Sequence, residues 1–316
     1  MRCPRPAATT SATTFAISTP SCLFGGKSMP AARACQVDEH LCLGGNNGIV
    51  AAMSGSILLN LLALVSLLPA ALLAFRPVAA RDGVFWGVII FAAAGSGAWA
   101  WLQLSQSWQT DLGVALWVSI ATTVLLFAAL AAFSRVGWRL APLVMPYLLL
   151  LGLLASVISG HGQPMVASAP AVWLDLHILV SVLTYGLLTL AAMASLAVFL
   201  QERALKKKRP GPLTRMLPAV VEGESLNGRL LMAGQIILGL GIATGMATQY
   251  FETGSLLRLD HKALLSLVSF ALIGALLLGH RVCGVRGRLA ARVVLAAYLL
   301  VTLAYPGVKF VTQVLL

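Results

Sequence analysis

The sequence predicts an all-α fold, a polytopic membrane helix bundle of about eight transmembrane helices. Hydrophobic residues make up 59% of the 316 residues and charged residues only 10%, whereas roughly 25% of an average soluble domain is charged. The apolar residues gather in runs of about 20, the length that crosses a hydrocarbon core of roughly 30 Å. The basic residues behind the net charge of +12 lie between these runs, as membrane topology requires. We therefore expect a lipid bilayer, and no nucleic acid, as partner.

The first 52 residues form a separate region. Residues 1–52 are rich in Ala, Thr, Ser, Pro and Gly, and they show neither helical periodicity nor the apolar core of a signal peptide. We expect this extension to be disordered. Met53 is followed directly by an apolar run, so translation starting at Met53 is the preferred interpretation, and a poorly formed targeting leader is the alternative. The transmembrane domain is then 53–316.

Eight apolar runs follow, and each is long enough to cross a membrane once as a helix, which satisfies its own backbone hydrogen bonds in lipid. They cover residues 54–75, 83–102, 112–133, 139–159, 172–200, 229–248, 262–280 and 292–311. Four prolines inside or near these runs predict kinks or first turns: Pro69, Pro142, Pro146 and Pro306.

The basic residues predict the orientation. The segments after the first, third, fifth and seventh runs carry fifteen Lys and Arg residues, and those after the second, fourth and sixth carry two. Because cytoplasmic loops are enriched in Lys and Arg, the first set is expected in the cytoplasm and both ends of the helical body on the periplasmic side. The longest cytoplasmic loop is expected at 201–228. Its basic cluster favours an anchor on anionic lipid headgroups, with a docking site for a soluble partner as the alternative.

Histidines are scarce, and their positions suggest a site. His177 and His261 open two spans near the predicted outer face, whereas His280 lies 19 residues beyond His261 on the same span, roughly 28 Å away along a helix. Neutral imidazoles on facing helices are a common way to hold haem iron. The alternative is that these histidines lie in the wet interface, bonded to Asp175 and Asp260. His161, in a glycine-flanked loop, fits the second interpretation.

Other functional signals are weak or absent. Tryptophans fall mostly near the ends of the runs, as in interfacial belts, and Trp173, four residues before His177, is the candidate for a cofactor wall. No carboxylate lies in the middle of a run, and the sequence contains no Ser-His-Asp set, phosphate-binding glycine loop or paired acid and base. These absences argue against an enzyme and against an ion-coupled transporter.

The stretch DLHILVSVLTYGLLTLAAMASLAVFLQER resembles a segment of cytochrome c assembly proteins of the CcsA/CcmC/HemX superfamily, with His177, Ser181 and Tyr185 at the matching positions. The resemblance continues through LPAVVEGESLNGRLLMAGQIILGLGIATG and HKALLSLVSFALIGALLLGHR to AYPGVKFV. The pattern is most similar to the YpjD branch of bacterial inner-membrane proteins. It covers roughly residues 172–312, and the earlier spans only by hydropathy.

The resemblance implies a bacterial inner-membrane protein that handles haem at the outer face, with His177 and His280 as cofactor-binding residues and other cytochrome c assembly proteins as partners. The sequence departs from the superfamily in two places. The stretch from Gln249 to His261 has no tryptophan-rich WWD segment, and Lys309 stands where the full assembly proteins have a haem-ligating histidine. Both departures argue against a direct synthetase role and leave His261 as a replacement ligand.

The leading hypothesis is therefore a haem-binding or haem-handling inner-membrane protein associated with cytochrome c assembly. It would act without turnover chemistry, with His177 and His261 as ligands of the haem iron. The alternative is a non-enzymatic accessory or transport protein with interfacial histidines and a basic partner-docking loop.

Overall fold

The computed structural model describes residues 58–73, 81–106, 111–158, 170–208, 211–254, 260–282, 284 and 287–303. The regular structure in these ranges is helical. An apolar helix at Leu58–Leu72 is followed by α2 (Gly83–Gln106), α3 (Leu112–Phe133), the 3-10 helix η2 (Gly137–Leu140), α4 (Ala141–Ile158), α5 (Ala171–Lys207), α6 (Pro212–Met216), α7 (Val220–Thr253), α8 (His261–Val282) and α9 (Arg288–Thr302). The extension 1–52 and the candidate start Met53 lie outside the described residues.

Each of the eight predicted runs overlaps an apolar helix in the described residues. Six helical stretches in the described residues are long and apolar enough to cross a membrane: Gly83–Gln103, Leu112–Phe133, Gly137–Ile158, Val172–Lys207, Val220–Thr253 and Ala263–Val282. The first and last runs form shorter apolar helices, Leu58–Leu72 and Leu289–Thr302. The predicted polytopic all-α membrane bundle is confirmed, and the number of eight crossings stays a prediction.

The predicted loop at 201–228 is wrong, because most of this segment is helical. Helix α5 continues through the basic cluster to Lys207, and α7 already begins at Val220. Apolarity stops near Leu200, but Gln, Glu, Arg, Ala and Lys are all good helix formers. Hydropathy therefore marks the end of the apolar run and not the end of the helix. Between the two long helices, Gln201 Nε2 donates to the carbonyl oxygens of Thr214 and Leu217 and so ties α6 to α5.

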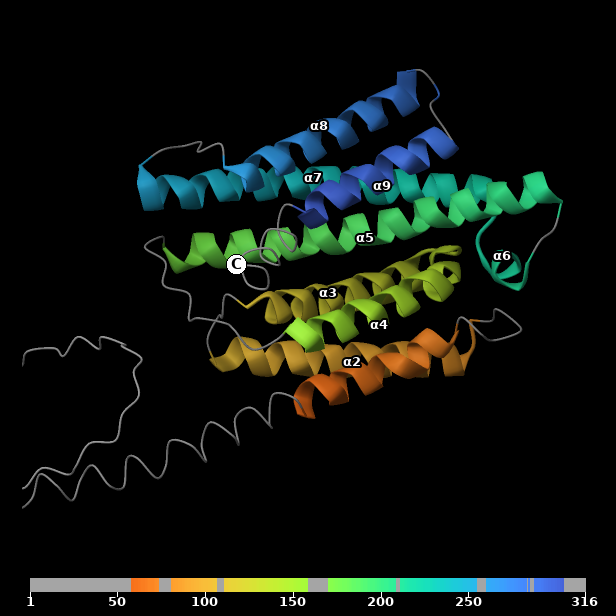
Figure 1. The fold of residues 1–316 in the computed structure, drawn as a ribbon, viewed down its shortest axis with the longest axis horizontal. Coiled ribbons are helices and arrows are strands. Elements are labelled where there is room, and N and C mark those ends of the chain that lie inside the picture. The colour runs from red at the N-terminus through yellow and green to blue at the C-terminus, as the bar shows by residue number, and fades with distance from the viewer. Residues whose placement is uncertain are drawn as a thin grey trace, which may run out of the picture. The chain divides into compact units, whose positions relative to one another are not determined.

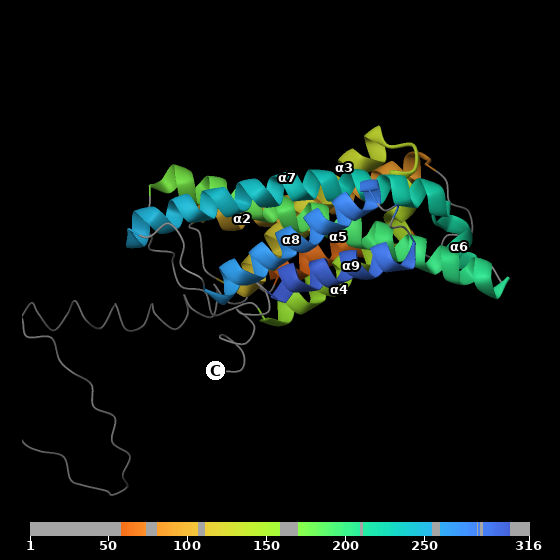
Figure 2. The same ribbon diagram turned by 90° about the horizontal axis from the view of Figure 1, so that it is seen from above.

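Helix α5 is the centre of the bundle. It contacts α3 and α4 on one side and α7 and α9 on another, and the two ribbon views show it running alongside α7 and α9 (Figures 1 and 2). Four glycines of α7 allow this close approach. A Cβ atom added at Gly223, Gly234, Gly241 or Gly245 would lie 2.8–3.5 Å from the side chains of Val198, Leu188, Val180 and His177, respectively. Small residues at helix contacts are typical of membrane bundles, where close backbone packing replaces the hydrophobic effect.

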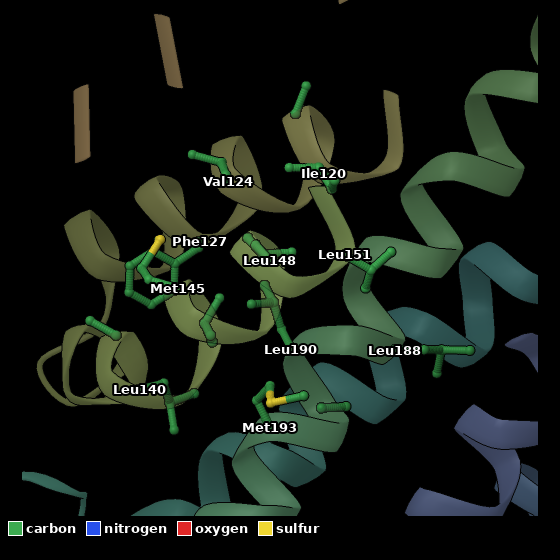
Figure 3. Close-up of a cluster of buried hydrophobic side chains, with 14 of the residues drawn as sticks. Ile120, Val124, Phe127, Leu140, Met145, Leu148, Leu151, Leu188, Leu190 and Met193 are labelled. Carbon is green, nitrogen blue, oxygen red and sulfur yellow. The ribbon is translucent and has the colours of Figure 1, made fainter. Parts of the chain in front are cut away.

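The core lies where α3 and α4 meet α5 (Figure 3). Phe127 of α3, Met145 and Leu148 of α4 and Leu190 of α5 are each at most 2% exposed. Two tryptophans near the predicted span ends also face inward, since Trp99 is 3% and Trp117 0% exposed. Their sequence positions were typical of an interfacial belt, but packing between helices buries both rings.

One buried hydrogen bond joins the first helix to α2. Trp99 Nε1 donates to Asn60 Oδ1 at 2.7 Å, and both side chains are buried. Replacing Asn60 with leucine leaves the indole N–H without its acceptor, so we expect the free energy of unfolding to fall by about 1 kcal/mol. Unfolding titrations of Asn60→Leu, Trp99→Phe and the double variant measure this coupling. Additive losses in the double variant would show that the bond contributes nothing.

Candidate cofactor-binding site at the N-terminal end of α5

The predicted site residues separate into the two ends of the bundle. His177 lies in the second turn of α5, Trp173 one turn before it, and His261 is the first residue of α8. Helices α5 and α8 begin, and α7 ends, toward the same end of the bundle (Figure 1). His280, in the last turn of α8, is a bilayer thickness away from His261 along that helix. His161 lies outside the described residues.

The imidazole of His177 is partly buried and bonded to the neighbouring helix. Its Nδ1 lies 3.2 Å from the hydroxyl oxygen of Thr244 on α7. The Thr244 hydroxyl is directed at the carbonyl oxygens of Leu240 and Gly241, at 3.0 and 3.1 Å. Because a hydroxyl group has one proton to donate, the Thr244 oxygen accepts from Nδ1–H of His177. In the neutral imidazole this assignment leaves the lone pair on Nε2, one of the two nitrogens through which histidine ligates a metal.

Gly245 makes room for the His177 ring. A Cβ atom at position 245 would lie 3.0 Å from Cε1 and 3.5 Å from Nδ1 of the imidazole. An alanine here would push against the ring and against its bond to Thr244. Thr244 and Gly245 are consecutive on α7, so one turn of this helix provides both the space for the His177 ring and its hydrogen-bond partner.

Two aromatic rings lie one turn further toward the helix ends. Trp173 of α5 and Phe251 of α7 have ring centroids 6.4 Å apart at an interplanar angle of 33°. They are 39% and 49% exposed. This pair provides a partly open apolar surface near His177, and the assignment of Trp173 to a cofactor wall stays a prediction.

The structure describes the backbone of His261 but not its side chain. Helix α8 packs mainly against α7 and α9, so its first residue lies across α7 from the start of α5, while the side chain of His261 lies outside the described residues. Among the described residues there is no group of three or more His, Cys, Asp and Glu side chains that could hold a metal ion.

Tyr185 and His280, two further residues of the family resemblance, lie away from His177. Tyr185 lies two turns deeper in α5, where its hydroxyl accepts from Tyr298 of α9 at 3.2 Å, and Tyr147 of α4 is hydrogen-bonded to the same Tyr298 hydroxyl. This tyrosine cluster joins three helices inside the bundle. His280 lines a pocket with residues of α5, α7 and α9, well away from His177.

Sequence reasoning missed Thr244 and Gly245. The interfacial alternative had His177 bonded to Asp175 or Asp260, but the Asp175 carboxylate is exposed on α5 and the imidazole is bonded to Thr244 on α7. One signal was present, because Gly241 and Gly245 are four residues apart in an apolar run, the spacing typical of close helix contacts in membranes. The spacing marks a contact face, but it does not name the helix that packs against it.

The chain is similar in sequence to several known bacterial proteins. The chain is 55% identical over 270 residues to an Azospirillum brasilense protein named "Uncharacterized 28.8 kDa protein in nifR3-like 5'region", covering 84% of this chain and all of the relative. It is 28% identical to Inner membrane protein YpjD of Escherichia coli strain K12, over 57% of this chain and 66% of YpjD. It is 33% identical to Protein HemX of Brevibacillus brevis over 28% of this chain and 33% of HemX.

The family described as "Cytochrome C assembly protein" matches residues 84–316, a range that contains every predicted site residue, nearly all of α2 and the helices from α3 to α9. The relatives include bacterial inner-membrane proteins, in agreement with the apolar helices of this multi-pass bundle. The chain belongs to the cytochrome c assembly protein family.

Proposed function

We propose that this protein binds or handles haem at the His177 end of the bundle, as a non-enzymatic component of cytochrome c assembly in a bacterial inner membrane. The observation that carries the proposal is the hydrogen bond between His177 and Thr244. With Nδ1–H donating to Thr244, the neutral imidazole keeps its lone pair on Nε2, where it is available to ligate iron. Family membership supports haem as the cofactor.

The residues present fit such a group. His177 would supply the principal axial ligand and His261, across α7, the second. The Trp173 and Phe251 rings would offer an apolar surface to the porphyrin, which is itself largely apolar. When bound, haem supplies an iron that two imidazoles can ligate, and the chain's own part is to hold His177 through Thr244 and Gly245. In this role the protein binds haem and neither makes nor breaks a covalent bond.

The orientation is part of the same proposal. The fifteen-to-two distribution of basic residues favours the His177 end on the periplasmic side. Reporter fusions after Lys208 should therefore report a cytoplasmic location, and fusions within 160–169 a periplasmic one. A fusion pair with the opposite result would place His177 on the cytoplasmic side and remove the outer-face assignment.

Haem titration of the purified protein tests the function directly. We expect a saturable Soret band with low-spin features, as bis-histidine ligation gives. Loading should be carried out in detergent and again in lipid nanodiscs, because free haem partitions into micelles. A spectrum that only matches haem in empty micelles or empty nanodiscs would overturn the haem proposal.

The second candidate function is docking of a soluble partner by the basic end of α5. This helix has 37 residues and is therefore about 55 Å long, well beyond a hydrocarbon core of roughly 30 Å. Its last turn carries Lys206 and Lys207, both exposed. Partner capture that is lost on replacing these lysines with glutamine, in a protein that takes up no haem, would favour this function.

A further inference from the structure

Three arginines lie beside two tryptophans at the end of the bundle opposite His177. Helix α2 begins, α3 ends and α4 begins toward this end (Figure 1). We call the cluster the arginine–tryptophan corner, and its members are Arg81, Trp86, Arg135, Trp138 and Arg139. The proposed haem site does not use it.

The corner lies where the membrane-crossing helices begin and end. Arg81 is two residues before the apolar stretch of α2, Arg135 is two residues after that of α3, and Arg139 is the third residue of the next one. Long Arg side chains near the ends of membrane helices place their charged groups at the interface. The three guanidinium groups are therefore expected at the depth of lipid headgroups.

The guanidinium of Arg81 is held by two contacts. Its Nη2 donates to the carbonyl oxygen of Ala132 at 3.1 Å, in the last turn of α3, where carbonyl groups lack partners within the helix. Its Cζ lies 5.3 Å from the ring centroid of Trp86, a cation–π distance. The bond to Ala132 uses one of five N–H donors, so the guanidinium keeps donors for an anion.

The ring of Trp138 supports a second guanidinium. Arg139 Cζ lies 5.6 Å from the centroid of this ring, and Trp138 Nε1 donates to the carbonyl oxygen of Arg135 at 3.0 Å. Phe85, which is 3% exposed, packs edge-on against both tryptophans, with centroids 5.7 Å from Trp86 and 6.2 Å from Trp138. The three rings thus hold the start of α2 against η2 and keep both supported arginines in one corner.

The corner carries an excess of positive charge. Its segments, 81–86 and 133–140, contain three Arg and one acidic residue, Asp82. Asp82 Oδ1 accepts from the backbone N–H of Phe85 at 2.9 Å at the start of α2. Phe133, 91% exposed at the end of α3, adds an apolar surface two residues before Arg135. Guanidinium groups beside an apolar surface fit an anion that is attached to an acyl chain.

We propose that the arginine–tryptophan corner binds the phosphate headgroup of an anionic phospholipid. A guanidinium presents its N–H donors in a planar fork that matches two phosphate oxygens. Because Arg81 and Arg139 are already held against aromatic rings, less conformational entropy is lost on binding. Arg135 adds its charge, and the acyl chains lie along the apolar faces of α2 and α3. The depth of the corner favours a lipid over a soluble phosphate.

Addition of lipid to the purified full-length protein in detergent tests the proposal. The unfolding temperature should rise with the concentration of phosphatidylglycerol and saturate, because a ligand that binds the folded state stabilises it. Phosphatidylcholine, whose choline cation is repelled by the arginines, should give a much smaller shift. Inorganic phosphate at the same concentration has no acyl chain and should also give a much smaller shift. A shift with either control as large as that with phosphatidylglycerol would overturn the proposal.

Paired variants place the lipid in the corner. Arg81→Gln removes the charge and the fork, so the apparent affinity for phosphatidylglycerol should fall about tenfold, and Arg139→Gln should cause a similar loss. Arg229→Gln removes an exposed arginine of α7 toward the same end of the bundle. It should change the affinity by less than about twofold. Equal losses in the Arg81 and Arg229 variants would show that the lipid responds to net charge and not to this corner.

Arg81→Lys separates the shape of the guanidinium from its charge. Lysine keeps the charge but has no planar fork to stack on Trp86, so its affinity should lie between those of the unchanged protein and Arg81→Gln. Unchanged affinity in Arg81→Lys would contradict the proposed role of the held guanidinium. Each shift is measured against the same variant without lipid, and if the Arg81 variants do not fold, Arg139→Gln against Arg229→Gln decides.

Discussion

Replacing His177 with alanine is expected to reduce haem affinity by more than about 100-fold and to abolish the low-spin spectrum. His177 is the proposed principal ligand, and its ring is hydrogen-bonded to Thr244 at 3.2 Å. Loss of only an outer-shell partner already costs about 10–100-fold in affinity. The measurement is a haem titration followed by the Soret band. His261→Ala is expected to convert the spectrum to a five-coordinate, high-spin form, because one axial ligand remains.

His280→Ala is the matched control for this prediction. His280 is also a helix-terminal histidine of the membrane domain, but it lines the pocket at the opposite end, about a bilayer thickness from His261. Its replacement should leave the spectrum largely intact. Unchanged spectra in both the His177 and His261 variants, at normal protein levels, would refute the haem-site assignment and favour interfacial histidines.

The second large effect is expected at Thr244, which does not contact the cofactor in the proposed arrangement. Thr244→Val keeps the shape of the side chain but removes the oxygen that accepts from Nδ1–H of His177. The ring is then free to rotate or to change tautomer, so haem affinity should fall about 10–100-fold. Thr244→Ser keeps an oxygen acceptor and should recover most of the affinity, a rescue that a purely structural role would not give.

Thr248→Val controls for the loss of a buried threonine from the same helix. Thr248 is as buried as Thr244, at 9% exposure, and lies one turn further along α7. Its hydroxyl bonds to the Gly245 carbonyl oxygen of its own helix. Its replacement should change haem affinity less than twofold, within the scatter of neutral substitutions. If the two valine variants lose equal affinity, the effect belongs to α7 packing and not to the tautomer of His177.

Much of the fold was predictable from the sequence because lipid imposes a local rule. Each apolar run must satisfy its own backbone hydrogen bonds, so it forms a helix whatever its neighbours are. The six long spans and the two shorter helices of the described residues accordingly overlap the eight predicted runs. The same local reasoning placed His177 in the first turns of α5 and His280 a full span away from His261. It failed at 201–228, where polar helix formers extend α5 and α7 beyond the apolar runs.

The chemistry of the site was decided by tertiary structure. Thr244 is 67 residues from His177 in sequence, and only the packing of α7 on α5 brings its hydroxyl to the imidazole. The glycines of α7 permit that contact, but their spacing in the sequence does not indicate which helix packs against them. The pocket that His280 lines is likewise formed by residues of four helices. Hydropathy acts within one segment, whereas a hydrogen bond between segments depends on which faces meet, and those faces are selected by the packing of the whole bundle.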